Sequence, residues 1–177
     1  MIIKKIYKQY LRKFRPLTYV KRCGMKFGKD LKIYGKVDWG TEPWIITIGN
    51  NVHITDGVKF ITHDGGTLLF RNLIPDLEIT KPIVVGDNVY FGNNVIVLPG
   101  VTIGSNVIIG AGAVVTKEIP NNSLVVGVPA RVIKSADEYL NKVSEESVHL
   151  GHLKGEEKDR ALMNYYGYKG NSKGIYF

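Results

Sequence analysis

Histidine is the residue type in this chain best suited to take a proton from a reacting group at neutral pH, and the sequence contains four: His53, His63, His149 and His152. A neutral imidazole with an ordinary pKa of about 6.5 can act as a general base without first losing a proton. His149 and His152 lie in a polar C-terminal stretch, and His53 sits in a regular segment, NNVHIT, where a surface position is expected. His63 differs from the others because it lies where a regular sequence pattern breaks.

That pattern is a six-residue period, which runs from Val85 to Pro120 as VGDNVY, FGNNVI, VLPGVT, IGSNVI, IGAGAV and VTKEIP. A bulky apolar residue opens each unit, and a small or β-branched residue follows four places later. Such a period drifts around an α-helix, but it suits a triangular coil with one strand and one turn on each side. Three units make a coil of about eighteen residues, with glycine and asparagine at corners that need a positive φ. The period therefore predicts an all-β solenoid.

The repeats are expected to occupy residues 27–134. They begin irregularly, shift in phase by three residues and become regular at Ile48. The pattern breaks after Phe60, and an excursion loop, 65–82, lacks the period before the repeats resume. His63 lies at the edge of this loop, so the chain is predicted to leave the coil close to the candidate base.

Two segments without the repeat flank the solenoid. Residues 135–177 are predicted to form a helical C-terminal tail, and residues 1–26 a basic helical arm or cap, broken at Pro16. In the arm, positions 3, 6, 7, 10, 11 and 14 carry apolar side chains at helical spacing. Twelve of the 24 Lys and Arg residues lie within residues 1–36 together with one acid, Asp30, so this segment carries a charge of +11 and the rest of the chain −3.

A basic amphipathic helix of this kind suits two roles. It can lie on an anionic membrane surface. Alternatively, its apolar stripe can pack on the end of the repeats, since a solenoid needs its exposed end capped. The capping role is the preferred one here, and the two are compatible. The arm offers no motif for reading bases, so no nucleic-acid partner is expected.

Composition narrows the cellular setting. No apolar run reaches the roughly 18 residues of a membrane span, and the first residues lack the apolar core of a signal peptide. The single cysteine, Cys23, excludes an internal disulfide, and nothing near it in sequence would activate it as a nucleophile. We therefore expect a cytoplasmic protein, at the inner face of the membrane if the arm binds lipid.

Three stretches carry a resemblance to a known family: FITHDGG (60–66), the repeat run 84–120 and VVGVPARVIK (125–134). On these, the chain resembles the hexapeptide-repeat acyltransferases and, within them, the O-acetyltransferases of sugars and surface polysaccharides. The resemblance implies a left-handed parallel β-helix of roughly six coils. It also implies a homotrimer, in which acetyl-CoA lies in a groove between neighbouring subunits.

The resemblance further implies a direct transfer without a metal or a covalent acyl-enzyme. His63 would take the proton of an acceptor hydroxyl as its oxygen attacks the thioester. Asp64 follows His63 directly, but adjacent side chains of an extended chain point to opposite faces. An aspartate elsewhere or a backbone carbonyl is therefore expected to orient the imidazole.

By the resemblance, six residues are assigned to acetyl-CoA: Asn93, Ala111, Thr116, Lys117, Arg131 and Lys134. Thr116 and Lys117 form the TK pair of the repeat run, and Lys117, Arg131 and Lys134 are expected near the phosphates. Weaker candidates for the acceptor pocket are Asp64, Tyr90, Asp38 and Trp39, with Glu42 beside the last two. Many relatives have tryptophan at the position of Tyr90. A tyrosine keeps the aromatic wall there but makes it smaller and adds a hydroxyl.

Two other functions on this fold suit the sequence less well. A zinc-dependent carbonic anhydrase needs three converging histidines, and the repeats hold two without suitable spacing. A non-catalytic scaffold would not need the THDGG segment, the excursion loop or the TK pair. A non-sugar acceptor such as an antibiotic remains an alternative to a sugar.

Overall fold

The computed structural model describes residues 2–168, but not the side chains of residues 2–5 and 8. Met1 and the last nine residues of the predicted tail, 169–177, lie outside the described residues. The chain divides into two compact units, Met1–Tyr139 and Leu140–Phe177.

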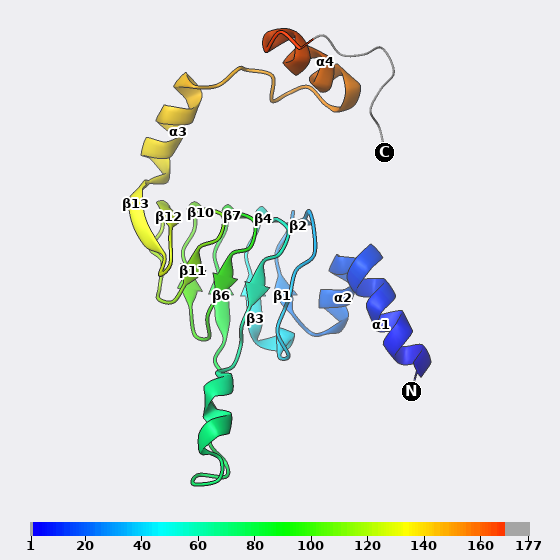
Figure 1. The fold of residues 1–177 in the computed structure, drawn as a ribbon, viewed down its shortest axis with the longest axis vertical. Helices are drawn as coiled ribbons and strands as arrows, with labels where there is room; N and C mark the ends of the chain where they lie inside the picture. Colours follow the sequence, from blue (N-terminus) through cyan, green and yellow to red (C-terminus); the bar gives the residue numbers. More distant parts are fainter. Residues whose placement is uncertain (1, 169–177) are drawn as a thin grey trace. The chain divides into compact units, whose positions relative to one another are not determined.

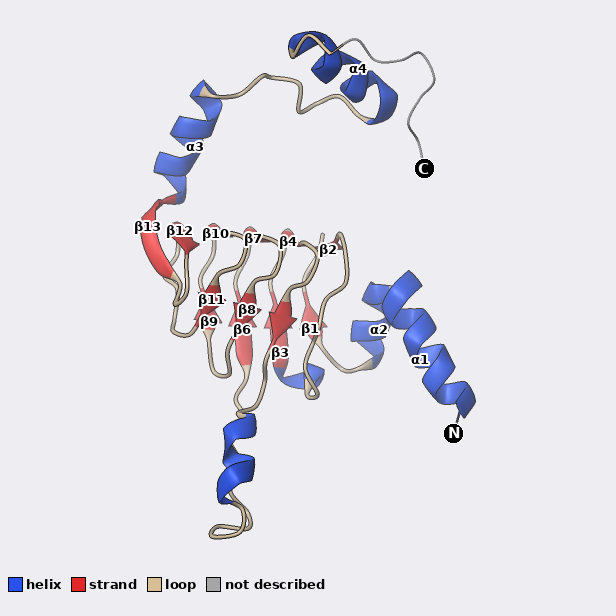
Figure 2. Cartoon of the chain, viewed as in Figure 1, coloured by secondary structure: helices blue, strands red, loops and turns tan. Residues whose placement is uncertain are grey.

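Three sheets, parallel in all their pairings except that of β12 with β13, form the body of the first unit (Figures 1 and 2). The first sheet contains β1 (Lys26–Phe27), β3 (Ile46–Ile48), β6 (Ile83–Val85) and β9 (Thr102–Ile103). The second contains β2 (Lys32–Ile33), β4 (Val52–Ile54), β7 (Val89–Phe91), β10 (Val107–Ile109), β12 (Ser123–Val126) and β13 (Arg131–Ser135). The third contains β5 (Lys59–Phe60), β8 (Ile96–Val97) and β11 (Val114–Val115). From β3 to β11 the chain visits the three sheets in turn, so each circuit forms a three-sided coil.

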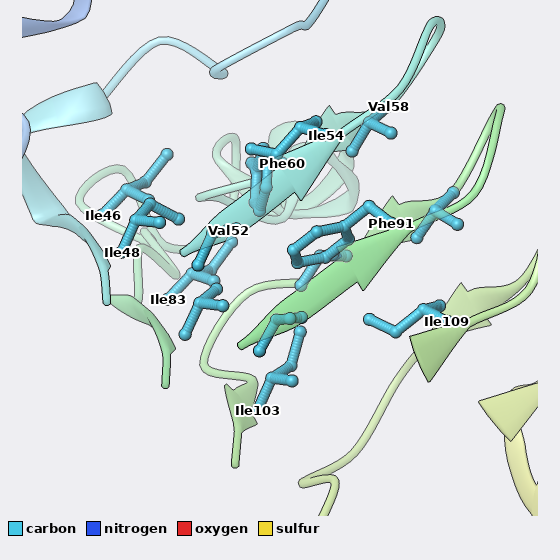
Figure 3. Packing of buried hydrophobic residues seen from close by; sticks show 14 of the residues in the cluster. Ile46, Ile48, Val52, Ile54, Val58, Phe60, Ile83, Phe91, Ile103 and Ile109 are labelled. Atoms are coloured by element: carbon cyan, nitrogen blue, oxygen red, sulfur yellow. The ribbon is translucent and has the colours of Figure 1, made fainter. Parts of the chain in front are cut away.

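The register of neighbouring strands follows the six-residue period. Val89 pairs with Val107 in the second sheet and Val97 with Val115 in the third, an offset of 18 residues in each case. Both apolar positions of every unit between Val85 and Ile119 are buried, at 5% exposure or less. Figure 3 shows such side chains stacked between the strands of successive coils. The apolar core therefore extends along the axis of the coil, as the period predicts.

Asparagine occupies the corners between strands. Asn51, Asn88, Asn94, Asn106 and Asn122 have φ between 50° and 60°, a conformation that asparagine adopts more readily than most side chains. The amide of Asn51 donates to Asn88 and that of Asn88 to Asn106, each over 3.0 Å, so these three side chains form a ladder along one corner.

Two interruptions change the register. A short 3₁₀ helix, η1 (Pro43–Ile45), comes before β3, and Phe27 pairs with Ile48, an offset of 21 residues. The excursion loop raises the next offset to 37 residues, as between Phe60 and Val97. This loop begins with η2 (Gly65–Phe70) and ends where β6 begins; it is the green segment that leaves the strands beside β6 in Figure 1. Five of its apolar side chains are at least half exposed: Leu68, Leu69, Phe70, Leu73 and Ile74.

The N-terminal arm forms two helices, α1 (Ile2–Phe14) and α2 (Pro16–Arg22). Leu11 of α1 is buried, together with Tyr19 and Val20 of α2. The expectation that the apolar stripe of the arm packs on the repeats is wrong for most of α1. Of its described apolar side chains only Leu11 is covered, and the others are exposed: Ile6, Tyr7, Tyr10 and Phe14.

The repeats end at β13, which pairs antiparallel with β12. The helix α3 (Ala136–Glu145) follows directly, and its start is capped because Ser135 and Glu138 bond reciprocally to each other's backbone N–H. A further helix, α4 (Gly155–Tyr165), lies in the second unit. Among residues 2–168, no helix is long and apolar enough to cross a membrane.

Candidate functional site

The 21-residue register of the first coil brings Glu42 to His63. Asp38 pairs with Lys59, and the ring of Trp39 stacks parallel to that of Phe60 with their centres 5.0 Å apart. Glu42 and His63 each lie three residues after one of these stacked rings. The three-residue phase shift seen in the sequence is therefore what places a carboxylate beside the candidate base.

Glu42 accepts hydrogen bonds on both carboxylate oxygens. Its Oε2 lies 3.2 Å from Nδ1 of His63 and 2.5 Å from Oγ1 of Thr62, which donates to it. Its Oε1 accepts from the hydroxyl of Thr41 over 2.5 Å, and that hydroxyl oxygen is also 3.1 Å from Nδ1 of His63. Thr62 is fully buried, so the carboxylate is anchored by a side chain that is itself fixed in the core. The imidazole is held at one nitrogen by two side chains from the preceding coil.

This arrangement favours one state of each group. Burial alone would raise the pKa of Glu42, but hydrogen bonds from Thr41, Thr62 and His63 outweigh it and hold the pKa below its ordinary value. An ionised Glu42 accepts a hydrogen bond from Nδ1–H of His63. The neutral imidazole then has its free lone pair on Nε2. Nε2 is therefore the atom that can take a proton from a substrate.

His63 opens onto a cleft of about 550 Å³. Its other walls come from the first coil and from the arm, and include Arg12, Asp38, Cys23 and Lys59. The carboxylate of Asp38 is exposed and lies 3.8 Å from the guanidinium of Arg12, so a negative and a positive group lie together in the cleft. Cys23 shares the cleft with His63, although the two residues lie 40 positions apart in the sequence.

Asp64 does not contact the imidazole in any described hydrogen bond and instead begins the excursion loop. Its carboxylate accepts from the N–H of Gly66 over 2.9 Å, and its backbone carbonyl accepts from the hydroxyl of Thr67. His63 pairs with Thr80 at the other end of the loop. These contacts give Asp64 an anchoring role beside the base.

The other two acceptor candidates, Trp39 and Tyr90, do not line the cleft. Trp39 is 2% exposed and packs in the core against Phe60, because its position in the coil faces inward. Tyr90 is 43% exposed on the outer surface of the second sheet, beside His53. Nδ1 of His53 shares a hydrogen bond of 2.7 Å with the hydroxyl of Tyr34. Within one chain, neither Trp39 nor Tyr90 lines the cleft of His63.

The donor candidates fall on different parts of the coil. Asn93 and Ala111 share the corner between the second and third sheets in adjacent coils, where the N–H of Gly112 donates to the carbonyl of Asn93 over 2.8 Å. A side chain at Gly92 would meet the backbone nitrogen of Ala111 at 2.5 Å, so the two coils approach closely there.

Thr116 and Lys117 are exposed at the next corner, after β11. Phe60 pairs with Val97 and Val97 with Val115, so Lys117 holds the place of Thr62 two coils further on, roughly 10 Å away. Arg131 and Lys134 lie on β13 at the edge of the second sheet. A single chain therefore does not gather all six donor candidates at one point.

Glu42 is the residue whose contact with His63 is not among the expectations from the sequence. The sequence predicts Glu42, with Asp38 and Trp39, only as a weak acceptor contact, and it favours an aspartate or a backbone carbonyl as the partner of His63. The signal was present in the phase shift, because an offset of 21 instead of 18 residues places Glu42 level with His63.

Comparison with known proteins gives consistent matches. The model of the family "Bacterial transferase hexapeptide (six repeats)" matches residues 82–117. Protein CapG of Staphylococcus aureus is 40% identical over 166 residues, which are 93% of this chain and 96% of CapG. Further relatives that carry the name acetyltransferase are 45–50% identical, over 44–61% of their own lengths.

Two solved structures extend the comparison. A maltose O-acetyltransferase from Clostridium difficile 630 is 30% identical with a TM-score of 0.58, over 75% of this chain and 83% of that one. A hexapeptide-repeat acetyltransferase of Vibrio cholerae, complexed with acetyl coenzyme A, is 26% identical with a TM-score of 0.55, over 73% of this chain and 82% of that one.

Proposed function

Because this chain belongs to the hexapeptide-repeat acyltransferases and uses acetyl-CoA as acyl donor, we propose that it acetylates a hydroxyl of a sugar or of a cell-surface polysaccharide precursor. The observation that carries the proposal is the pair formed by His63 and Glu42 in an open cleft. A histidine whose Nδ1 is held by an ionised carboxylate is suited to deprotonate an alcohol.

In the proposed mechanism His63 acts as general base. Its Nε2 takes the proton of the acceptor hydroxyl while the oxygen attacks the carbonyl carbon of the thioester. The negative charge of Glu42 stabilises the imidazolium that forms. The tetrahedral intermediate then collapses, the carbon–sulfur bond breaks, and the proton on Nε2 passes to the leaving sulfur. The products are an acetyl ester and CoA, and His63 is regenerated.

We propose that the coil is a left-handed β-helix of roughly six turns and that the active assembly is a homotrimer. The distribution of the donor candidates supports the assembly, since Asn93 and Ala111 lie on one corner and Lys117 on another. A groove between two copies would bring different corners together. The exposed apolar side chains of the excursion loop offer a surface for such a contact.

In this assembly Asn93 and Ala111 would line the pantetheine arm, with Thr116 beside it. Lys117, Arg131 and Lys134 would offer positive charge to the phosphates of CoA.

The cleft beside His63 supports the proposed binding of a sugar acceptor. Asp38 and Arg12 provide an acceptor and a donor for sugar hydroxyls close to His63. A similar protein is named a maltose O-acetyltransferase, which supports a sugar. Tyr90 enters the acceptor pocket only if a neighbouring copy supplies it. We place the protein in the cytoplasm, where acetyl-CoA is available, with its basic arm at the inner face of the membrane.

The variant His63→Ala tests the proposal. We expect loss of turnover, measured as thiol release from acetyl-CoA with a panel of saccharide acceptors, and an unchanged thermal unfolding curve. His152→Ala, an exposed histidine of the tail, is the matched control and should keep wild-type activity. Activity of His63→Ala near that of the wild type would refute the general base. Saturable acetyl-CoA binding without turnover on any acceptor would favour a non-catalytic scaffold, and turnover only on an antibiotic would favour a non-sugar acceptor.

A further inference from the structure

The first helices present an apolar surface to solvent. We name this surface the N-terminal ridge; it consists of Ile6, Tyr7, Tyr10, Phe14 and Leu17, which are 40–62% exposed. Positions 6, 10 and 14 follow one another at intervals of four and so lie on one side of α1. The ring centres of Tyr7 and Tyr10 are 6.5 Å apart and those of Tyr10 and Phe14 5.4 Å, so the aromatic part of the ridge is continuous.

The orientation of α1 is held by contacts beside and opposite the ridge. Leu11, which borders the ridge on the helix surface, is 5% exposed and belongs to the core cluster. Arg12 lies on the far side of the helix, 3.8 Å from Asp38 and over the ring of Tyr19 at 5.6 Å. These contacts hold α1 with the ridge toward solvent.

Positive charge surrounds the ridge. Lys13 stands over the ring of Phe14 at 5.2 Å, and Arg22 of α2 stands over the ring of Tyr7 at 5.3 Å. Arg15 and Lys21 are also exposed. With a charge of +11 on residues 1–36, the exposed aromatic surface lies within the most basic part of the chain.

An occupant of this surface must cover apolar rings and carry negative charge around them. A bilayer with anionic headgroups offers both, because aromatic side chains insert at the boundary between headgroups and acyl chains while Lys and Arg meet the phosphates. The ridge of a second copy fits less well, since contact between two ridges would bring two strongly positive segments together. We propose that the N-terminal ridge is a membrane-docking surface for bilayers that contain anionic phospholipids.

Docking on the ridge has a consequence for catalysis that rests on the proposed function. Arg12 and Tyr19 belong to the docking helices and also line the cleft of His63. A chain held by the ridge would therefore have its acceptor cleft on the other side of α1 from the lipid surface, about one helix diameter of 10 Å away. This geometry favours an acceptor that the membrane itself carries, such as a saccharide attached to a lipid.

Vesicle co-sedimentation of the full-length protein tests the docking without any acceptor or turnover. We expect binding to vesicles of phosphatidylcholine mixed with phosphatidylglycerol, weak binding to phosphatidylcholine alone, and weaker binding as salt is raised. The double variant Tyr10→Ser/Phe14→Ser should lower the partition coefficient by about tenfold or more. The matched control is Tyr165→Ser/Tyr166→Ser, which removes two rings of similar exposure from α4 and should bind as the wild type does.

Three results would overturn the proposal: no preference of the wild type for anionic vesicles, wild-type binding by Tyr10→Ser/Phe14→Ser, or a change in oligomeric state of this variant by sedimentation velocity. The last result would make the ridge an interface between copies. Circular dichroism and thermal unfolding establish that the variant is folded. His63→Ala should bind vesicles as the wild type does, so a failure of the proposed catalysis and a failure of the docking are distinguishable.

Discussion

Replacing Glu42 by glutamine tests whether this carboxylate supports the general base. Glutamine keeps the shape of the side chain and one acceptor oxygen, so Thr62 and Nδ1 of His63 can still be bonded. It removes the negative charge that faces the imidazolium in the transition state. We therefore expect a lower kcat with little change in the KM for acetyl-CoA.

The size of the effect follows from the distance of 3.2 Å between Nδ1 and Oε2. Coulomb's law gives about 5 kcal/mol at an effective dielectric constant of about 20, and about 1.3 kcal/mol at about 80. The two side chains are 38% and 24% exposed, so water screens part of the interaction and the lower half of this range applies. A loss of about 1.4–3 kcal/mol corresponds to a fall in kcat of about 10- to 150-fold.

The assay is thiol release from acetyl-CoA at saturating acceptor, with kcat and KM determined separately. Glu145→Gln, an exposed carboxylate on α3, is the matched control and should leave both constants unchanged. The difference between wild type and Glu42→Gln should also depend on pH. Because the pKa of Glu42 is lowered in the folded protein, its charge is present above the ordinary value of 4.5 and is lost only as the pH falls through the lowered value. A kcat within about twofold of the wild type would refute the reasoning, and a rise in KM alone would assign Glu42 to binding.

Two further substitutions test the donor side and the core. Lys117→Ala should raise the KM for acetyl-CoA by about tenfold, the usual loss for one hydrogen bond to a charged group, with kcat nearly unchanged; an unaltered KM would remove Lys117 from the phosphate site. Phe60→Ala should lower the free energy of unfolding by about 3–5 kcal/mol in urea, because this 1% exposed ring packs against both Trp39 and Phe91. Leu140→Ala, at a side chain of α3 that is 59% exposed, should change it by less than about 0.5 kcal/mol. A loss below about 1 kcal/mol for Phe60→Ala would contradict the packing described for the core.

The sequence predicts the coil well because its period states directly which side chains face inward. Val85, Phe91 and Val97 open successive units and are all buried. The excursion loop has a signal of the same kind, since the period stops before it and resumes after it. In the structure, η2 begins at Gly65 and β6 begins at Ile83.

The site was less predictable, because its geometry depends on register between coils. Glu42 meets His63 through an offset that η1 lengthens, and a uniform eighteen-residue coil would not have aligned them. Trp39 was expected in the acceptor pocket, but the same register places it on Phe60 in the core.

The arm shows a second limit. Helical spacing of apolar residues establishes that α1 has an apolar side, but not whether another part of the chain covers it. Tyr10 and Phe14 satisfy the periodicity as well as Leu11 does, and only Leu11 is buried. Burial here is decided by the contacts of Arg12 and Leu11 with the first coil, which a single sequence does not reveal.

The antiparallel strand β13 closes one edge of the second sheet. The strands of this sheet from β2 to β12 pair in parallel with those of the next coil, so β12 would present free backbone groups on which another chain could continue the sheet. β13 reverses direction along β12, with a shift in register between Leu124 and Val125. It thereby occupies the edge of β12 with a strand that cannot template a further parallel coil in this sheet. The repeat that builds the coil ends, on this side, in a strand of opposite direction that opposes the end-to-end addition of a second copy.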